Sequence, residues 1–380
     1  MKKKENKISM KKNNLWMIAT VVFTIAAIML TSQDEQQGAF ASSKATKKTK
    51  HVTKKIKRQE IAIQRTVWRE NGVAMVKIPA KYRFAKPATR TFQTGEYSIR
   101  LSAASFALGN AVYVEIVPRT GEFSRENNNT EFTFDGSLVP LTPMRWGFRG
   151  LFAIPPDSRS GLKKIVLKTG RKDDLNEFQL IVVNRVFEVY RRGMDLGQYS
   201  EEDLLKNRPD LQARVDDETR RKEIIFATVG QDVITSKLSH PRNEHKITST
   251  FYAKRITEQY SCHNGKKVRA LPKVRFHNGV DLKGRNGAPI YAIASGIVVV
   301  AENMFYEGNQ VILDHGNGIF TRYMHMSKIN VQPGMYVEGG RVIGLCGDTG
   351  MVTGPHLHAG FLVRGVYVDP LSFLSLPIKD

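Results

Sequence analysis

Four residues near the C-terminus have the types and spacing of a metal site. His277 and Asp281 are four residues apart, and Gly279 between them is expected to let the backbone bend. His356 and His358 lie in a predicted strand, where alternate side chains share one face, so that both imidazoles project to the same side. Two neutral imidazoles and one carboxylate form a three-ligand zinc site whose fourth position is open to water, which is the arrangement of a catalytic site.

A further imidazole, His325, lies on a predicted strand of the same region. Zinc lowers the pKa of its water from about 16 toward about 7 and polarises a substrate carbonyl. A second imidazole near the metal can take the proton of that water or hold the oxyanion. Each pattern alone has an ordinary structural explanation. Together, in this order and framed by glycines, they favour a catalytic zinc site.

Short strands must position these residues. From about Gly230 the pattern is β-like and rich in glycine, and Gly316-Asn317-Gly318 is a predicted turn. The predicted strands are Ile290–Ile293, Ile297–Val300, Gln310–Leu313, Phe320–His325, Arg341–Leu345 and His356–Leu362.

The region from about Val73 to Val189 also has the short alternating runs of an all-β sandwich, separated by turn residues. No chemical constellation is visible in it, so binding, spacing or masking are its available roles. The predicted strands are Val73–Ile78, Tyr97–Leu101, Val112–Val117, Glu131–Phe134, Leu151–Ile154, Lys164–Leu167 and Phe178–Val183.

Helical signals separate the two β regions. Ser200 and Asp203 resemble a capping box, and Pro209-Asp210 is a typical helix start for a segment that runs to about Phe226. This segment is interpreted as a helical connector between domains.

The chain is strongly basic. It carries 58 Lys and Arg against 36 Asp and Glu, and residues 1–58 contribute 14 basic and 3 acidic residues to this balance. A basic protein favours polyanions such as nucleic acid, anionic lipid head groups or anionic envelope polymers. A solvated basic surface without a specific partner is the alternative.

The N-terminus indicates export. Six lysines within the first twelve residues precede an uncharged apolar run from Leu15 to Leu30, and Ala39-Phe40-Ala41 has the small-x-small pattern of a cleavage site. The run is short for a membrane span of about 20 residues, so a cleaved signal peptide and an anchor in residues 15–31 both stay open. Export to a periplasm or cell envelope removes nucleic acid as the natural partner.

The sequence contains two cysteines, Cys262 and Cys346. In an exported protein they are able to form one disulfide, but the spacing does not demand it. Two cysteines alone cannot form a thiolate zinc site.

The C-terminal motifs resemble the lysostaphin/LytM-type zinc endopeptidases over roughly Lys246–Leu371. The resemblance rests on Phe276–Asp281, Gly287–Pro289, Ala294–Gly296, Leu313–Gly318, Tyr323–His325 and Gly347–His358. It implies an antiparallel sheet with a groove walled by loops, one zinc ion, and cleavage of peptide bonds in peptidoglycan stems or cross-bridges. It also implies that His277, Asp281 and His358 bind the zinc, whereas His325 and His356 assist catalysis.

Two further features bear on this resemblance. Phe132–Pro140 and Gly147–Gly161 look like the Ig-like domain that precedes this peptidase domain in some envelope proteins. Tyr260–Val274 departs from the family as a longer, basic insertion before the first ligand, and it contains His263. His263 and His315 are interpreted as turn residues rather than ligands.

The sequence thus predicts a mainly β protein with five parts. They are a signal peptide or membrane anchor (1–41), a basic flexible spacer (42–72), an Ig-like β-sandwich (73–190), a helical connector (191–235) and a zinc metallopeptidase domain (236–380).

The predicted function is zinc-dependent hydrolysis of peptidoglycan peptides during cell-wall remodelling. Anionic envelope polymers or lipid head groups are additional candidate partners, and the oligomeric state stays open. The alternative is a non-enzymatic envelope module that binds cell wall or activates amidases. A third possibility is a latent enzyme whose groove is covered by the sandwich or the connector.

Overall fold

The computed structural model describes residues 66–70, 73–77, 86–119, 130–169, 175–195, 208–263, 266–269 and 272–380. The chain divides into two compact units, residues 1–59 and 60–380, and every described residue belongs to the second. The predicted signal peptide or anchor, most of the predicted spacer and the predicted capping box at Ser200 lie outside the described residues. Among those described, no helix has the length and apolar character needed to cross a bilayer.

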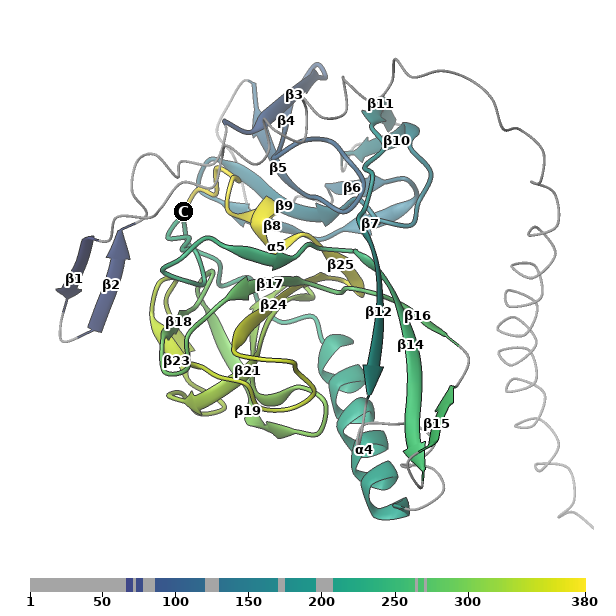
Figure 1. The fold of residues 1–380 in the computed structure, drawn as a ribbon. Coiled ribbons are helices and arrows are strands. Elements are labelled where there is room, and N and C mark those ends of the chain that lie inside the picture. Colours follow the sequence, from purple (N-terminus) through teal and green to yellow (C-terminus); the bar gives the residue numbers. More distant parts are fainter. Residues whose placement is uncertain are drawn as a thin grey trace, which may run out of the picture. The chain divides into compact units, whose positions relative to one another are not determined.

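The described chain is mainly β, as the sequence predicts (Figure 1). Its first two strands form a small antiparallel sheet of their own, β1 (Thr66–Glu70) and β2 (Val73–Lys77). β2 therefore lies outside the sheets of the sandwich, although the pattern from Val73 onward suggested that the sandwich begins there.

Two antiparallel sheets pack on each other to form the predicted β-sandwich. The first has the order β3-β4-β5-β9-β8 and consists of β3 (Ala88–Gln93), β4 (Tyr97–Ala103), β5 (Ala111–Pro118), β9 (Gly147–Ala153) and β8 (Leu141–Met144). The second has the order β11-β10-β6-β7 and consists of β11 (Leu175–Val182), β10 (Gly161–Lys168), β6 (Glu131–Phe134) and β7 (Ser137–Val139).

Alternating apolar residues hold the two sheets together. Val112 and Val114 of the first sheet share one buried cluster with Ile165 and Leu167 of the second. Every second residue of these strands faces the core, as the period of a strand requires. The sandwich is thus present, while its assignment as Ig-like stays a prediction.

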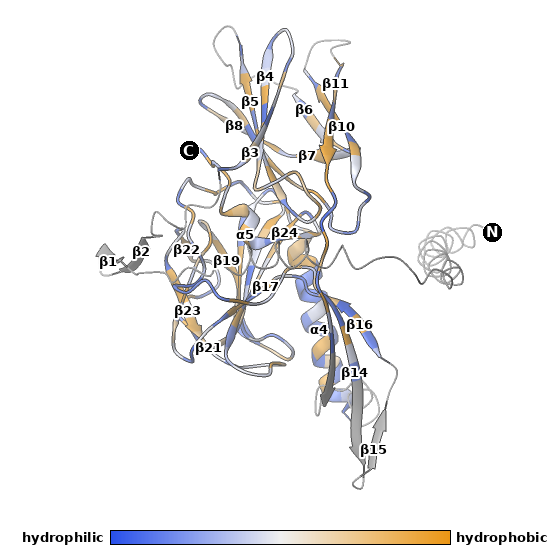
Figure 2. Ribbon diagram, turned by 45° about the horizontal axis from the view of Figure 1, so that its top comes forward, coloured by the Kyte–Doolittle hydropathy of each residue, from blue (hydrophilic) through white to orange (hydrophobic). Residues whose placement is uncertain are grey.

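The described part of the predicted connector contains a strand as well as a helix. α4 spans Pro209–Phe226, as predicted, with Pro209 at the first helical position. Apolar (orange) and polar (blue) segments follow each other along it in Figure 2. β12 (Val189–Asp195) is extended because it pairs in parallel with β14, a partner more than 60 residues away that local patterns do not reveal.

The described residues of the predicted insertion lie mostly in three antiparallel strands, which together are called the arm. β14 (Lys254–His263) pairs with both β15 (Lys266–Arg269) and β16 (Lys273–Phe276). Together with β12 these strands form a separate four-stranded sheet, whose strand β16 ends directly before His277.

A ten-stranded sheet forms the C-terminal region. Its main order is β13-β17-β24-β21-β20-β19-β22, with β18, β23 and β25 paired beside it, and every pairing is antiparallel. The strands are β13 (Ile247–Ser249), β17 (Val280–Lys283), β18 (Pro289–Tyr291), β19 (Gly296–Met304), β20 (Gly308–Gly316), β21 (Ile319–Ile329), β22 (Tyr336–Val337), β23 (Val342–Cys346), β24 (His356–Val363) and β25 (Val366–Val368). The short helix α5 (Pro370–Phe373) follows them.

A buried ion pair joins the sandwich to the C-terminal region. Arg149 of β9 is 6% exposed and donates to both carboxylate oxygens of Asp232 at 2.9 and 3.0 Å. It also donates to the carbonyl oxygens of Ile234 and Lys379. A bidentate guanidinium–carboxylate pair fixes orientation as well as distance, so the strand β9 is held firmly to the segment before the ten-stranded sheet.

Candidate metal centre

Strand pairing brings two of the predicted ligands face to face. β17 and β24 are antiparallel neighbours, and their register places Asp281 directly opposite His358. Leu357 is fully buried in the apolar core. The residues on either side of it, His356 and His358, therefore turn toward the other face, as the alternation of a strand predicts.

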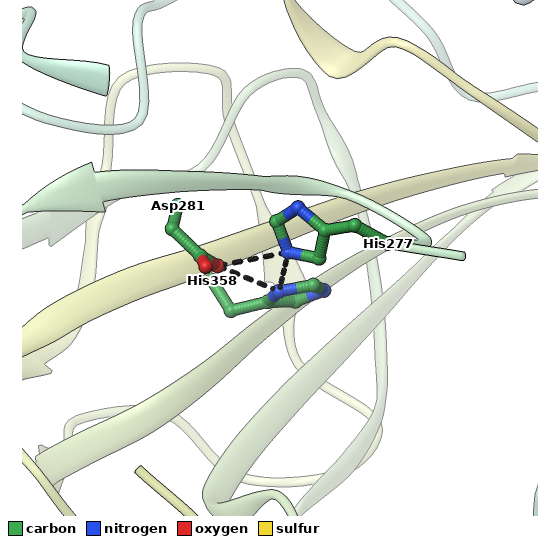
Figure 3. A group of neighbouring side chains, drawn as sticks. All are labelled: His277, Asp281 and His358. Atoms are coloured by element: carbon green, nitrogen blue, oxygen red, sulfur yellow. Dashed lines mark hydrogen bonds and ion pairs between the residues drawn. The ribbon is translucent and has the colours of Figure 1, made fainter. Parts of the chain in front are cut away.

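The third residue, His277, lies in the turn before β17 and points at the same place (Figure 3). Its Nε2 is 3.0 Å from Oδ1 of Asp281 and 3.0 Å from Nδ1 of His358. Oδ1 of Asp281 and Nδ1 of His358 are also 3.0 Å apart. All three residues are buried. The structure thus brings together three ligand atoms that are able to hold a metal ion.

Gly279 lies in a bend of the backbone, and glycine is required there for lack of space. A Cβ at this position would lie 2.3 Å from the carbonyl oxygen of Ala359 and 2.7 Å from Nε2 of His358. Its φ does not lie in the left-handed region. The backbone does bend at residues 278–279, as expected, and the close approach of β24 is what excludes a side chain here.

A backbone carbonyl selects the tautomer of His277. Nδ1 lies 2.8 Å from the carbonyl oxygen of Thr250, which only accepts hydrogen bonds, so Nδ1 carries the proton. The lone pair of Nε2 then faces Asp281 and His358. If Nδ1 of His358 is also unprotonated, three lone pairs meet at 3.0 Å and repel one another unless a cation lies among them, which is the arrangement of a metal site.

The buried carboxylate is held in its charged form. Burial opposes ionisation of Asp281, but the adjacent ring nitrogens of His277 and His358 outweigh it and hold its pKa well below the usual range. Burial lowers the pKa of His358 to about 3, so this imidazole is neutral at pH 7. A neutral imidazole and a charged carboxylate are the forms in which these groups bind metal.

Arg255 is a neighbour of the site that the sequence patterns did not identify. It lies on β14, and its Nη2 donates to Oδ2 of Asp281 at 2.7 Å and to Oγ of Ser249 at 2.8 Å. No periodic signal connects positions 255 and 281, since the contact depends on where the arm meets the ten-stranded sheet.

The two remaining predicted residues form a second pair beside the triangle. The rings of His325 on β21 and His356 on β24 have centroids 4.9 Å apart. Nε2 of His356 is 3.7 Å from Oδ1 of Asp281, and the ring centroid of His325 is 6.2 Å from that of His358. All five predicted site residues thus lie within one cluster.

Backbone carbonyls also select the tautomers of this pair. Nδ1 of His325 lies 2.9 Å from the carbonyl oxygen of Thr349, and Nδ1 of His356 lies 2.8 Å from that of Gly354. Each Nδ1 therefore carries the proton, and each Nε2 has a free lone pair. Burial, followed by the neighbouring His356, lowers the pKa of His325 to about 4.

The backbone of His325 is strained. Its φ is +63°, in the left-handed region that residues other than glycine rarely adopt. Its amide donates to the carbonyl oxygen of Glu307 at 3.0 Å, which helps to hold this conformation. The strain therefore lies at a residue of the candidate site.

Two minor predictions have different outcomes. His315 is fully buried in β20 and both ring nitrogens have partners, Ser295 and Thr321, so its interpretation as a turn residue is wrong. Cys346 is a buried free thiol, while the side chain of Cys262 lies outside the described residues, as does that of His263.

Comparison with known proteins assigns the region that carries this cluster. Residues 275–370 match the model of peptidase family M23. This part of the chain is a peptidase family M23 domain. The matched range contains all five residues of the cluster. The group of side chains that could hold a metal therefore belongs to a peptidase domain.

The chain also matches curated relatives. Over 99 residues it is 50% identical to peptidoglycan DD-endopeptidase ShyA of Vibrio cholerae, covering 26% of this chain and 23% of that protein. Over 133 residues it is 43% identical to peptidoglycan DD-endopeptidase ShyB of the same organism, covering 35% and 28%. The chain thus spans about a quarter of the length of these relatives.

A longer match exists among solved structures. A crystal structure of a peptidase M23 from Pseudomonas aeruginosa shares 22% identity with a TM-score of 0.48. The match covers 71% of this chain and 94% of that one.

Proposed function

We propose that this protein is a zinc-dependent endopeptidase that hydrolyses peptide bonds in peptidoglycan stems or cross-links. The triangle formed by His277, Asp281 and His358 carries the proposal. It offers two nitrogen atoms and one oxygen atom at one point in an M23 domain. The proposed ligands of the zinc are these three residues, and the proposed catalytic residues are His325 and His356.

The ligand atoms fit zinc. Zinc binds nitrogen and oxygen ligands at about 2.0–2.1 Å in tetrahedral sites, so neighbouring ligand atoms lie roughly 3.3 Å apart. The three atoms here are 3.0 Å apart in each pair, within a small adjustment of that value. Mg²⁺ and Ca²⁺ instead prefer a shell of oxygen atoms, which two imidazoles do not supply.

The second histidine pair supplies proton transfer. When bound, zinc polarises the scissile carbonyl and makes water more acidic. Nε2 of His325 and Nε2 of His356 both present lone pairs, so either atom is able to take a proton from the attacking water. The same nitrogen then returns the proton to the leaving amine, and the protonated ring stabilises the negative charge of the intermediate.

The names of the relatives favour a particular substrate. ShyA and ShyB are peptidoglycan DD-endopeptidases. We therefore propose peptidoglycan as the substrate, and a bond between two D-configured centres in a cross-link as the first bond to test. This would place the protein in the cell envelope, with residues 1–41 as its signal peptide or anchor. The net charge of +22 favours anionic envelope polymers or lipid head groups as additional partners.

Digestion of purified peptidoglycan tests the proposal. We expect new muropeptides by mass spectrometry after incubation with the zinc-loaded protein, and the mass difference identifies the bond that is cut. The His325→Ala variant should keep its zinc and lose about 10²–10⁴-fold in rate, the range of general acid–base catalysis. His325→Asn is a second variant, because asparagine tolerates the left-handed backbone at this position.

The non-enzymatic alternative makes the opposite prediction. A module that only binds cell wall or activates amidases should release no muropeptide, and His325→Ala should keep the function of the parent. The complete set of five side chains disfavours this alternative, because a binding module does not need the second histidine pair. Stoichiometric zinc without any product would contradict the proposed activity.

A further inference from the structure

The two oxygen atoms of Asp281 have different partners. Oδ1 faces the triangle, at 3.0 Å from both His277 and His358. Oδ2 accepts a hydrogen bond of 2.7 Å from Nη2 of Arg255. The side chain of Asp281 is 11% exposed and that of Arg255 is 38% exposed, so solvent weakens this ion pair only in part. The guanidinium therefore occupies the oxygen that the triangle does not use.

The same nitrogen of Arg255 also contacts the segment that holds His277 in place. Nη2 also donates to Oγ of Ser249, which lies 3.4 Å from Nδ1 of His277. The next residue, Thr250, supplies the carbonyl oxygen that accepts from this Nδ1. The amide of Tyr252 donates to the carbonyl oxygen of His277. One segment, residues 249–255, thus contacts the outer side of two members of the triangle.

This segment links two sheets. Ser249 ends β13 of the ten-stranded sheet, while Arg255 belongs to β14 of the arm. β14 is held in turn by β12 and β16. The position of the guanidinium therefore depends on the packing of the arm and not only on the strands that carry the triangle.

A charged partner on the outer oxygen has two chemical effects. It keeps Oδ2 away from the metal, so that the carboxylate binds through one oxygen and leaves a coordination position open for water or substrate. It also withdraws negative charge from the carboxylate, which makes a bound metal a stronger Lewis acid. Neutral donors at this place would orient the carboxylate less strongly, because charge-assisted hydrogen bonds are about twice as strong.

We propose that Arg255 is a positioning residue that holds Asp281 in one-oxygen binding geometry and so connects the arm to the metal centre. This inference rests on the proposed metal site. It concerns the affinity and geometry of metal binding, and it needs no assumption about which bond is cut.

Metal binding by full-length variants tests the proposal. Arg255→Met removes the donor while keeping much of the aliphatic bulk, and Arg255→Lys keeps a positive charge. Lys254→Met is the matched control, since Lys254 is exposed on the same strand and its contacts are backbone contacts. Zn²⁺ affinity is measured by competition with a chelator, and the visible absorption of the Co²⁺-loaded protein reports the number of ligands.

We expect Arg255→Met to bind Zn²⁺ about 10–100-fold more weakly, as is usual when a partner behind a metal ligand is lost. The visible absorption of the Co²⁺-loaded variant should be weaker, as in a site with more ligands, because Oδ2 is then free to bind the metal. Arg255→Lys should recover part of both signals, and Lys254→Met should match the parent.

Equal Zn²⁺ affinity and an unchanged Co²⁺ spectrum in a folded Arg255→Met protein would overturn the proposal. A parent protein that binds no Zn²⁺ would overturn it together with the proposed function. A parent that binds Zn²⁺ but releases no muropeptide would count against the proposed activity alone.

Discussion

The sandwich and the C-terminal region are both built from antiparallel strands around apolar cores, yet they bury different polar groups. Eight of the nine histidines in the sequence lie between positions 240 and 358, and none lies in the sandwich. The structure describes the side chains of seven of these eight, and five of the seven are buried: His240, His277, His315, His325 and His358. The buried charged residues of the sandwich, Glu115 and Arg149, contact the C-terminal region instead.

This difference separates polar groups that hold the fold from polar groups that are arranged for chemistry. Arg149 directs four of its five N–H donors to protein oxygen atoms, so it serves to hold the fold. In the candidate centre the carbonyl oxygens of Thr250, Thr349 and Gly354 each take one imidazole proton, and a lone pair is left facing the site. Burial with one free lone pair is the signature of a ligand or a base.

Removing one proposed metal ligand should have the largest effect: the C-terminal region should lose metal binding, while the sandwich should be unaffected. We expect His358→Ala to weaken zinc binding by more than the roughly 100-fold that loss of an outer hydrogen bond costs. The apolar core beneath β24 stays intact in this variant, so the sandwich should still fold. Zinc titration gives the affinity and thermal melting reports the fold. Zinc affinity equal to that of the parent would contradict the ligand assignment.

A substitution in the sandwich core should lower the stability of the fold without changing metal binding. Phe152 is 2% exposed and its ring stacks on Phe134 at 4.3 Å between centroids. Phe152→Ala should lower the free energy of unfolding by about 3–5 kcal/mol and leave the zinc affinity of the folded protein unchanged.

Leu162→Ala is the control for this prediction, because Leu162 is 63% exposed on the outer face of the second sheet. It should change the free energy of unfolding by less than about 0.5 kcal/mol. A loss of zinc affinity in Phe152→Ala would show that the sandwich supports the centre, and the separation of the two regions would fail.

Acid should act mainly through the C-terminal region. Burial lowers the pKa of His315 to about 4, below the value near 6.5 expected in the unfolded chain. Its contribution to stability is complete above pH 6.5 and is lost as the pH falls from 6.5 to 4. The slope is at most about 1.4 kcal/mol per pH unit for this group.

Denaturant unfolding of the metal-free protein at pH 7 and pH 5 measures this loss. His315→Asn should be less stable than the parent at pH 7 and should lose less on going to pH 5. The same pH dependence in parent and variant would show that His315 does not contribute.

Much of the fold was accessible from the sequence because local patterns dominate it. The first and last residues of α4 follow from Pro209 and the apolar stripe that ends at Phe226, and the strand of His356 and His358 follows from simple alternation. The pairing of β12 with β14 was not accessible, since it depends on a parallel contact between distant segments. The same is true of Arg255, whose partner Asp281 is reached only through packing of the arm.

The sequence by itself determined which side chains are available as donors and which of them share a face, because residue type and strand period are local properties. Only the tertiary structure decided which lone pairs meet. The register that sets Asp281 opposite His358 joins positions 77 residues apart. The carbonyl oxygen of Thr250 and the guanidinium of Arg255 then orient the remaining atoms. These contacts depend on distance and direction in space, and a linear pattern contains neither.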